Sequence, residues 1–165
     1  MGHKNVADFT QAVNFILGHE GGLSVNEADP GGITNFGISQ HAYPQVDVSR
    51  LTREQAVTIY HMEFWRYDAI RSQRVANKLL DQAVNFGLKG ATKILQESLQ
   101  YFRAPGVAAD GILGADTLTA VNGVAPDDLF RELAARGAQR HALDVIVNPK
   151  LGVFLLGWLR RDIDG

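Results

Sequence analysis

Cysteine is missing from all 165 residues of the chain. Its absence excludes disulfide bonds, thiolate metal sites and a cysteine nucleophile, and it leaves the redox compartment open. The five histidines show no metal-ligand spacing, and the segment from His19 to Leu23 departs from the HExxH zinc motif. We therefore expect neither a bound metal ion nor another cofactor.

A strong charge of one sign is also lacking, because 16 basic and 18 acidic residues give a formal net charge of −2. Such a chain has no overall positive field to attract nucleic acid, so DNA binding is disfavoured. No apolar run reaches the roughly 18 residues of a membrane span, and the first residues lack the apolar region of a secretory signal. We expect a chain made in the cytoplasm, without stable membrane insertion, that reaches any external substrate by another release route.

What the sequence does contain is a largely helical pattern. Hydrophobic residues make up 45% of the chain, which is enough for a sizeable core. Thr52 and Gln55 match a capping box that opens a helix toward Trp65. Apolar residues at helical spacing predict further helices over 5–17, 75–86, 90–102, 117–121 and 127–147, and a last one that carries Trp158. Both tryptophans are expected in the core.

One region near the front has a different character. Short β-prone pieces, residues 23–25 and 33–38, flank the turn sequence Asp29-Pro30-Gly31-Gly32. The fold class predicted is therefore mainly α, with one small irregular β-hairpin near the N-terminus. A weak boundary near residues 86–90 separates a front segment, 1–88, from a back segment, 89–165, and we expect the two to pack as one compact, monomeric unit.

The same region carries a candidate pair of acids. Glu20 follows an apolar helix and precedes two glycines, so packed side chains can desolvate its carboxyl and keep it protonated as a general acid. Asp29 and Thr34 lie across the expected hairpin, where a second carboxylate and a hydroxyl could activate and hold water. Two carboxyls facing one another suit glycoside hydrolysis. A solvated helix end at Glu20 and an ordinary turn at Asp29 remain as alternatives.

These residues resemble a known signature. Glu20-Gly21-Gly22 and the run from Asp29 to Ile38 are similar to the motif of glycoside hydrolase family 108, the bacterial and phage N-acetylmuramidases. Residues 60–65 (YHMEFW) and 81–87 (DQAVNFG) resemble two further segments of that family. The back segment, with Asp110-Gly111-Ile112-Leu113-Gly114, Thr117 and residues 157–161 (GWLRR), resembles the peptidoglycan-binding segment that usually follows.

The resemblance implies a lysozyme-like helical fold and a substrate, the glycan strands of peptidoglycan. It implies that Glu20 is the acid that cleaves the bond after N-acetylmuramic acid, in a phage endolysin or a protein that helps release others through the wall. The order Glu20, Asp29, Thr34 also resembles the triad of T4-type phage lysozymes, although here the interval from Asp29 to Thr34 is one residue shorter. If the triad carries over, water attacks in a single inverting displacement.

Four other residues are candidates for substrate binding. Asn35, Gln82 and Asn85 could donate to sugar hydroxyls or acetamido groups, and Tyr60 could line a glycan cleft with its aromatic face. Asp81 could instead serve the structure, pairing with Lys78 or Asn85 at helical spacing. Two other functions stay open: a wall-binding module without hydrolysis, and a lytic transglycosylase that forms 1,6-anhydro ends.

Overall fold

The computed structural model of the chain describes residues 6–19, 22–25 and 32–163. Its helices are α1 (Phe9–His19), α2 (Arg53–Phe64), α3 (Gln73–Tyr101), α4 (Ala115–Val121), α5 (Pro126–Val147) and α6 (Gly152–Ile163). Short 3-10 turns, η1 (Val48–Arg50) and η2 (Pro149–Leu151), precede α2 and α6. The mainly α fold class is therefore confirmed.

The capping box at the start of α2 is also confirmed. The Thr52 hydroxyl accepts a hydrogen bond from the Gln55 amide at 3.3 Å, and the Gln55 side chain accepts one from the Thr52 amide at 2.9 Å. Two backbone donors that the first helical turn leaves without partners are satisfied in this way. The helix ends before Trp65, as the sequence predicts.

The helices predicted over 75–86 and 90–102 run together in α3, with a break at Gly87. This glycine has φ 73° and ψ 160°, a backbone conformation that essentially only glycine adopts, so the helix axis changes direction there. The expected interruption is present, but the chain resumes a helix at once instead of forming a loop. The helix thus continues from the front segment into the back segment.

The predicted hairpin is part of a three-stranded antiparallel sheet in the order β1 (Ser24–Val25), β2 (Ile33–Asn35) and β3 (Ile38–Ser39). Ser24 lies opposite Thr34. The expected single β-prone piece over 33–38 is split, because Phe36 and Gly37 both have positive φ, 51° and 75°. Two successive residues of this kind make the tight turn that joins β2 to β3.

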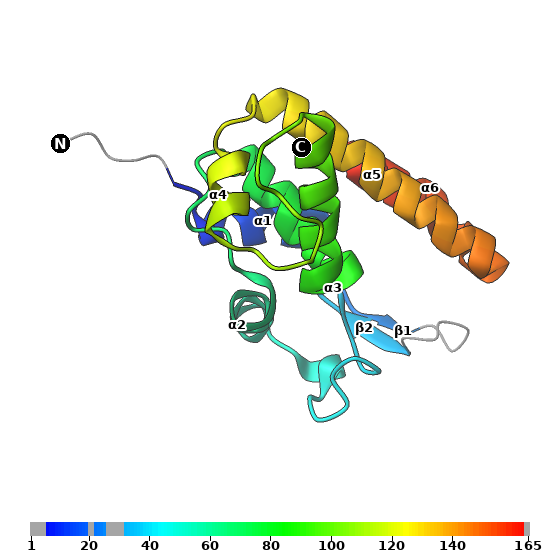
Figure 1. The fold of residues 1–165 in the computed structure, drawn as a ribbon. Coiled ribbons are helices and arrows are strands. Elements are labelled where there is room, and N and C mark those ends of the chain that lie inside the picture. Colours follow the sequence, from blue (N-terminus) through cyan, green and yellow to red (C-terminus); the bar gives the residue numbers. More distant parts are fainter. Residues whose placement is uncertain (1–5, 20–21, 26–31, 164–165) are drawn as a thin grey trace.

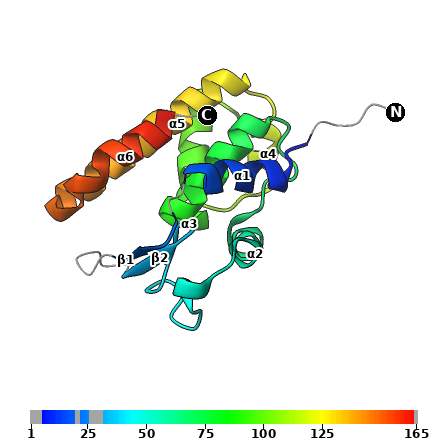
Figure 2. The same ribbon diagram turned by 180° about the vertical axis from the view of Figure 1, so that it is seen from behind.

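Helix α3 lies at the centre of the molecule and packs against α1, α2 and α5 (Figures 1 and 2). The core is one continuous cluster that includes the fully buried Leu79, Leu80, Leu95 and Leu99 of α3. Trp65 is buried in this core as predicted, whereas Trp158 on α6 keeps part of its surface exposed. The sheet lies at one end of α3, and the α5–α6 hairpin projects beyond the helical body (Figure 1).

Candidate functional site

The end of α1 and the small sheet frame the predicted catalytic residues. Glu20 directly follows the last residue of α1, and Asp29 belongs to the link between β1 and β2; both lie outside the described residues. Thr34 is described: it occupies the middle of the central strand β2, half-buried, opposite Ser24 and Ser39. The roles of all three residues remain predictions.

Asn35, a predicted sugar ligand, is directed into the protein. Its side chain is buried, and its amide nitrogen donates to the carbonyl oxygens of Val48, at 3.2 Å, and Leu51, at 3.3 Å. These bonds fasten β2 to the segment that leads into α2. The Asn35 amide therefore fixes the position of the strand that carries Thr34.

Tyr60 is likewise part of the core. Its side chain is completely buried, and its hydroxyl donates to the Phe36 carbonyl oxygen at 2.8 Å. The bond holds the residue of the β2–β3 turn that has an unusual positive φ. A ring without exposed surface has no face to offer a sugar, so the contacts of Tyr60 are those of a support for the sheet.

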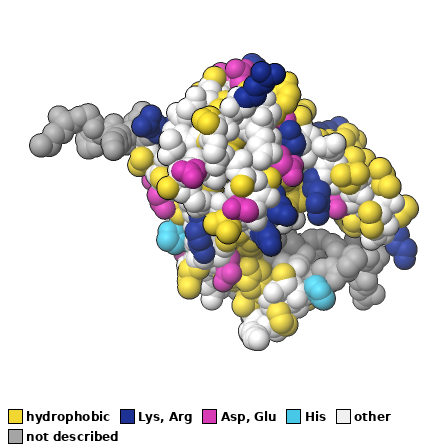
Figure 3. All heavy atoms as spheres, in the orientation of Figure 1, with side chains coloured by type: hydrophobic (Ala, Val, Ile, Leu, Met, Phe, Trp, Pro, Cys, Tyr) yellow, Lys and Arg dark blue, Asp and Glu magenta, His cyan; other side chains and the backbone are white. Residues whose placement is uncertain are grey.

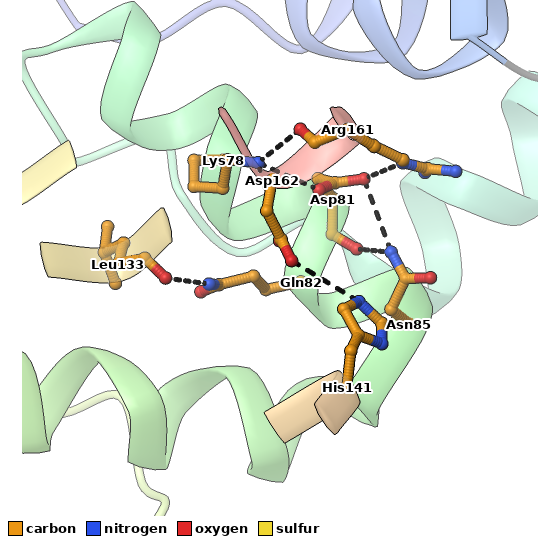
Figure 4. A network of polar contacts seen from close by, with 8 residues as sticks. All are labelled: Lys78, Asp81, Gln82, Asn85, Leu133, His141, Arg161 and Asp162. Atoms are coloured by element: carbon orange, nitrogen blue, oxygen red, sulfur yellow. Dashed lines mark hydrogen bonds and ion pairs between the residues drawn. The ribbon is translucent and has the colours of Figure 1, made fainter. Parts of the chain in front are cut away.

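A buried polar cluster lies on the first half of α3, and it includes two of the predicted binding residues (Figure 4). Gln82 is fully buried and donates to the Leu133 carbonyl oxygen of α5 at 2.7 Å. The Lys78 ammonium lies 3.3 Å from an Asp81 carboxylate oxygen, which confirms the predicted pairing. Asn85 donates to the Asp81 carbonyl oxygen at 2.8 Å, the other predicted contact.

The partners that complete the cluster come from α6 (Figure 4). The Arg161 guanidinium donates to the Asp81 carboxylate, and the Arg161 carbonyl oxygen accepts from Lys78 at 2.9 Å. Asp162, also buried, lies 3.9 Å from the Lys78 ammonium. Removing one member of such a buried ionic group leaves an uncompensated charge, so the cluster fixes α6 against α3.

His141 of α5 closes the cluster on its third side. The ring lies between Phe86 and Trp158, with 4.6 Å between centroids on each side, and its Nε2 is 3.8 Å from the Asp162 carboxylate. Burial lowers the pKa of His141, so the imidazole favours its neutral form. Burial, together with the nearby Asp81 charge, raises the pKa of Asp162 to about 7 against the attraction of Lys78 and Arg161.

Asn85 differs from the other predicted binding residues because it is exposed. Its amide nitrogen is held by Asp81, and no described residue donates a hydrogen bond to its amide oxygen. The cluster therefore fixes the orientation of an amide whose oxygen accepts no hydrogen bond from the described part of the chain.

The sequence did not reveal Arg161 and Asp162 as partners of α3, since charged residues near the end of the chain are typical of a solvated helix face. One signal was present. Asp162 falls on the same helical stripe as Leu155, Trp158 and Leu159, the inward face of α6. A carboxylate on an apolar stripe indicates a buried partner of opposite charge.

In the back segment, residues of the Asp110–Thr117 motif form a network of hydrogen bonds with Gln96. The buried Gln96 amide nitrogen donates to the Asp110 carboxylate at 2.8 Å and to the Thr117 hydroxyl at 3.3 Å. Its amide oxygen accepts from the Gly111 backbone at 2.8 Å. Gly111 has φ 80°, and an added Cβ would lie 2.7 Å from Lys89 Cγ. The motif thus holds the loop before α4 against α3.

Surface hollows border this back segment. One, of about 510 Å³, lies between the end of α3 and α4 and includes Phe102 and Thr119 in its lining. Another, of about 260 Å³, lies between α3 and α5 beside Phe86, with Lys93, Arg136 and other residues around it. Within the described ranges, no three acidic or histidine side chains are arranged to hold a metal ion.

Comparison with known proteins divides the chain near the Gly87 break. Residues 13–87 match the family model described as Glycosyl hydrolase 108, and residues 90–163 match the one described as Predicted Peptidoglycan domain. Among solved structures, Brucella abortus SagA is similar, with a TM-score of 0.69 and 29% identity over 95% of this chain and 97% of that one. No curated protein matches the chain.

Proposed function

Since the front segment of this chain belongs to glycoside hydrolase family 108 and the back segment to a peptidoglycan domain family, we propose that it is an N-acetylmuramidase. The family assignments place it among lysozyme-like hydrolases that act on peptidoglycan. The finer proposal is that it cleaves the β-1,4 bond between N-acetylmuramic acid and N-acetylglucosamine, as a monomer without a cofactor, after release to the wall.

The observation that carries the proposal is the pairing of a hydrolase family segment with a wall-binding family segment across one helix. Residues 13–87 and 90–163 share α3, and the buried ionic cluster joins Lys78 and Asp81 of the first to Arg161 and Asp162 of the second. A rigid junction of this kind keeps the catalytic site at a constant distance from the surface that binds peptidoglycan.

We propose that Glu20 donates the proton that the departing sugar oxygen requires. The glycines around it let a glycan strand approach the backbone closely. Asp29 then takes a proton from water as that water attacks the anomeric carbon from the opposite face, and Thr34 holds the water through its hydroxyl. One displacement by water inverts the anomeric centre, and the hydrolysed ends carry the free reducing group.

Of the predicted binding residues, Asn85 is the one whose surroundings suit a direct contact. Its amide oxygen faces no described donor, and Asp81 holds the rest of the group in place. We propose that it accepts a hydrogen bond from a sugar hydroxyl or acetamido group. Asn35, Tyr60 and Gln82 support the site indirectly, since their polar atoms bind backbone carbonyls in the interior.

The test is to digest purified peptidoglycan and identify the products by mass spectrometry. The parent protein is expected to release fragments with reducing N-acetylmuramic acid ends. Glu20→Gln should keep its circular dichroism spectrum and its melting temperature, and should lose at least about 100-fold in rate, because general acid catalysis contributes about that much or more. Glu27→Gln provides a matched control from the same region and should retain the parent rate.

Three results would contradict the proposal. A Glu20→Gln variant that digests the wall at the parent rate removes Glu20 from the chemistry. Products with 1,6-anhydro ends assign a lytic transglycosylase, in which no water attacks. Protein that sediments with insoluble peptidoglycan but releases no reducing ends assigns a wall-binding module.

A further inference from the structure

The far end of the α5–α6 hairpin exposes apolar side chains away from the body of the protein. We define the hairpin tip as residues 143–156, which include η2. Figure 1 shows it projecting beyond the sheet, and Figure 3 shows hydrophobic side chains gathered on the projection. Five apolar residues are at least half exposed there: Leu143 (50%), Ile146 (73%), Val147 (85%), Val153 (80%) and Leu156 (60%).

The exposure follows from where the two helices stop touching the core. Closer to the body, α5 buries Leu133, Gly137 and His141 against α3 and α6. Leu143 still borders the hollow beside Phe86 of α3, and beyond it the two helices have mainly each other to pack against, so the outward positions of each turn face solvent. Clustered apolar side chains of this kind mark a surface that binds something, because single exposed ones are scattered on ordinary surfaces.

Cationic side chains lie behind the apolar ones on both helices. Arg140 precedes Val147 by seven residues on α5, and Arg160 follows Val153 by seven residues on α6; both are exposed. Lys150 lies in η2 at the end of the tip. The one acid within 140–160 is Asp144, which is 3.6 Å from the Arg140 guanidinium. The tip region is therefore positive, although the whole chain is slightly negative.

The spacing matches the depth of a lipid interface. With a rise of about 1.5 Å per residue, Leu143 to Val147 spans about 6 Å, and the two arginines lie about 10 Å behind the apolar ends. Helices that lie in a bilayer surface bury their apolar face about 5–10 Å deep, with basic residues at the level of the headgroups. Lys150 has an aliphatic stem long enough to keep its charge at that level.

We propose that the hairpin tip docks this protein on the surface of a bilayer that contains anionic phospholipid. The contact is interfacial, since none of the helices among the described residues is long and apolar enough to cross a membrane. A narrow projection with apolar groups on two helices suits insertion between lipids, whereas a dimer interface needs a broad self-complementary face. The proposal does not depend on the proposed hydrolytic function.

The absence of cysteine allows a direct test with one introduced label. Val153→Cys carries an environment-sensitive fluorophore at the tip, and Ile112→Cys, at a residue 68% exposed on the body, is the matched control. With vesicles of phosphatidylglycerol and phosphatidylethanolamine, emission from the tip label should shift to the blue and resist aqueous quenchers, while the control label should not change. Vesicles of phosphatidylcholine should weaken the shift because they offer Arg140, Lys150 and Arg160 no anionic headgroups. High salt should weaken it because it screens the attraction between these charges.

A second measurement follows unlabelled protein that sediments with the same vesicles. The double variant Val147→Ser, Val153→Ser should lower the partition coefficient at least tenfold, and Ile112→Ser should not. Both positions are highly exposed, so both variants should keep the parent melting temperature. The proposal is overturned if the parent protein does not sediment, if it binds neutral vesicles equally well, or if the double variant binds as the parent does. It is also overturned if the parent protein does not bind lipid and the tip mutations instead abolish a dimer or abolish binding to the wall.

Discussion

Asp162 is a buried acid whose protonation couples the stability of the protein to pH. Its pKa is raised to about 7 in the folded protein, compared with an ordinary value of 3.8, and the first cause is burial. Between those two pH values the folded state binds more protons than the unfolded state. The free energy of unfolding contributed by Asp162 therefore falls as pH rises from about 4 to about 7, and is level above that.

We expect Asp162→Asn to remove this dependence. As pH rises from 4.5 to 8, the unfolding free energy of the variant minus that of the parent should increase by on the order of 2–4 kcal/mol. Urea unfolding of both proteins across that range measures this difference. The lowered pKa of His141 works in the other direction, because the unfolded state takes up its proton first as pH falls, and this term is present in both proteins. The exposed Asp116→Asn should leave the pH profile parallel to that of the parent. Parallel profiles for Asp162→Asn would contradict the assignment.

Individual side chains also show where sequence reasoning reaches its limit. The pairing of Asp81 with Lys78 and Asn85 could be predicted, because residues three or four apart meet on a helix. The roles of Tyr60 and Asn35 could not, since their partners are backbone carbonyls 13 to 24 residues away. Residue type gives the capacity to bind, and only the fold decides whether a sugar or a carbonyl is the partner.

At the scale of elements, the helices were predictable within a few residues because each carries a local signal. The capping box opens α2, Pro126 begins α5, and Gly87 marks the break in α3. The sheet was harder. Its strands have two or three residues, too few for a reliable alternation pattern, and the turn at Phe36 requires a positive φ from a residue that rarely adopts one.

Two glycines in different helices should respond oppositely to the same substitution. Gly87→Ala places a Cβ on a backbone that only glycine tolerates, so we expect a loss of about 1–3 kcal/mol in unfolding free energy. Gly157 lies in α6 with open space around it, and Gly157→Ala should gain up to about 1 kcal/mol through helix propensity. Urea unfolding followed by far-ultraviolet circular dichroism measures both. If the two substitutions changed the unfolding free energy equally, the break in α3 would straighten without a loss of stability.

At the scale of the whole molecule, the cluster on α3 joins the two family segments, and we expect them to unfold as one cooperative unit. The chain has two tryptophans, Trp65 in the front segment and Trp158 in the back segment, so Trp65→Phe and Trp158→Phe each leave one reporter. In each variant, the fluorescence midpoint in urea should equal the midpoint by circular dichroism, as a two-state transition requires. If the back-segment reporter changed at a lower urea concentration than the helix signal, the two segments would unfold separately.

The position of α6 in the sequence has a consequence for the order in which the protein is made. Lys78 and Asp81 leave the ribosome long before their partners, because Arg161 follows them by 83 and 80 residues. At about 5–20 residues per second, the front segment waits roughly 4–16 s for the helix that covers these charges. Throughout that interval Lys78 and Asp81 have each other as charged partners but lack Arg161. A product that stops before α6 therefore carries this ion pair on α3 without the helix that covers it, and we expect it to be less stable than the full chain.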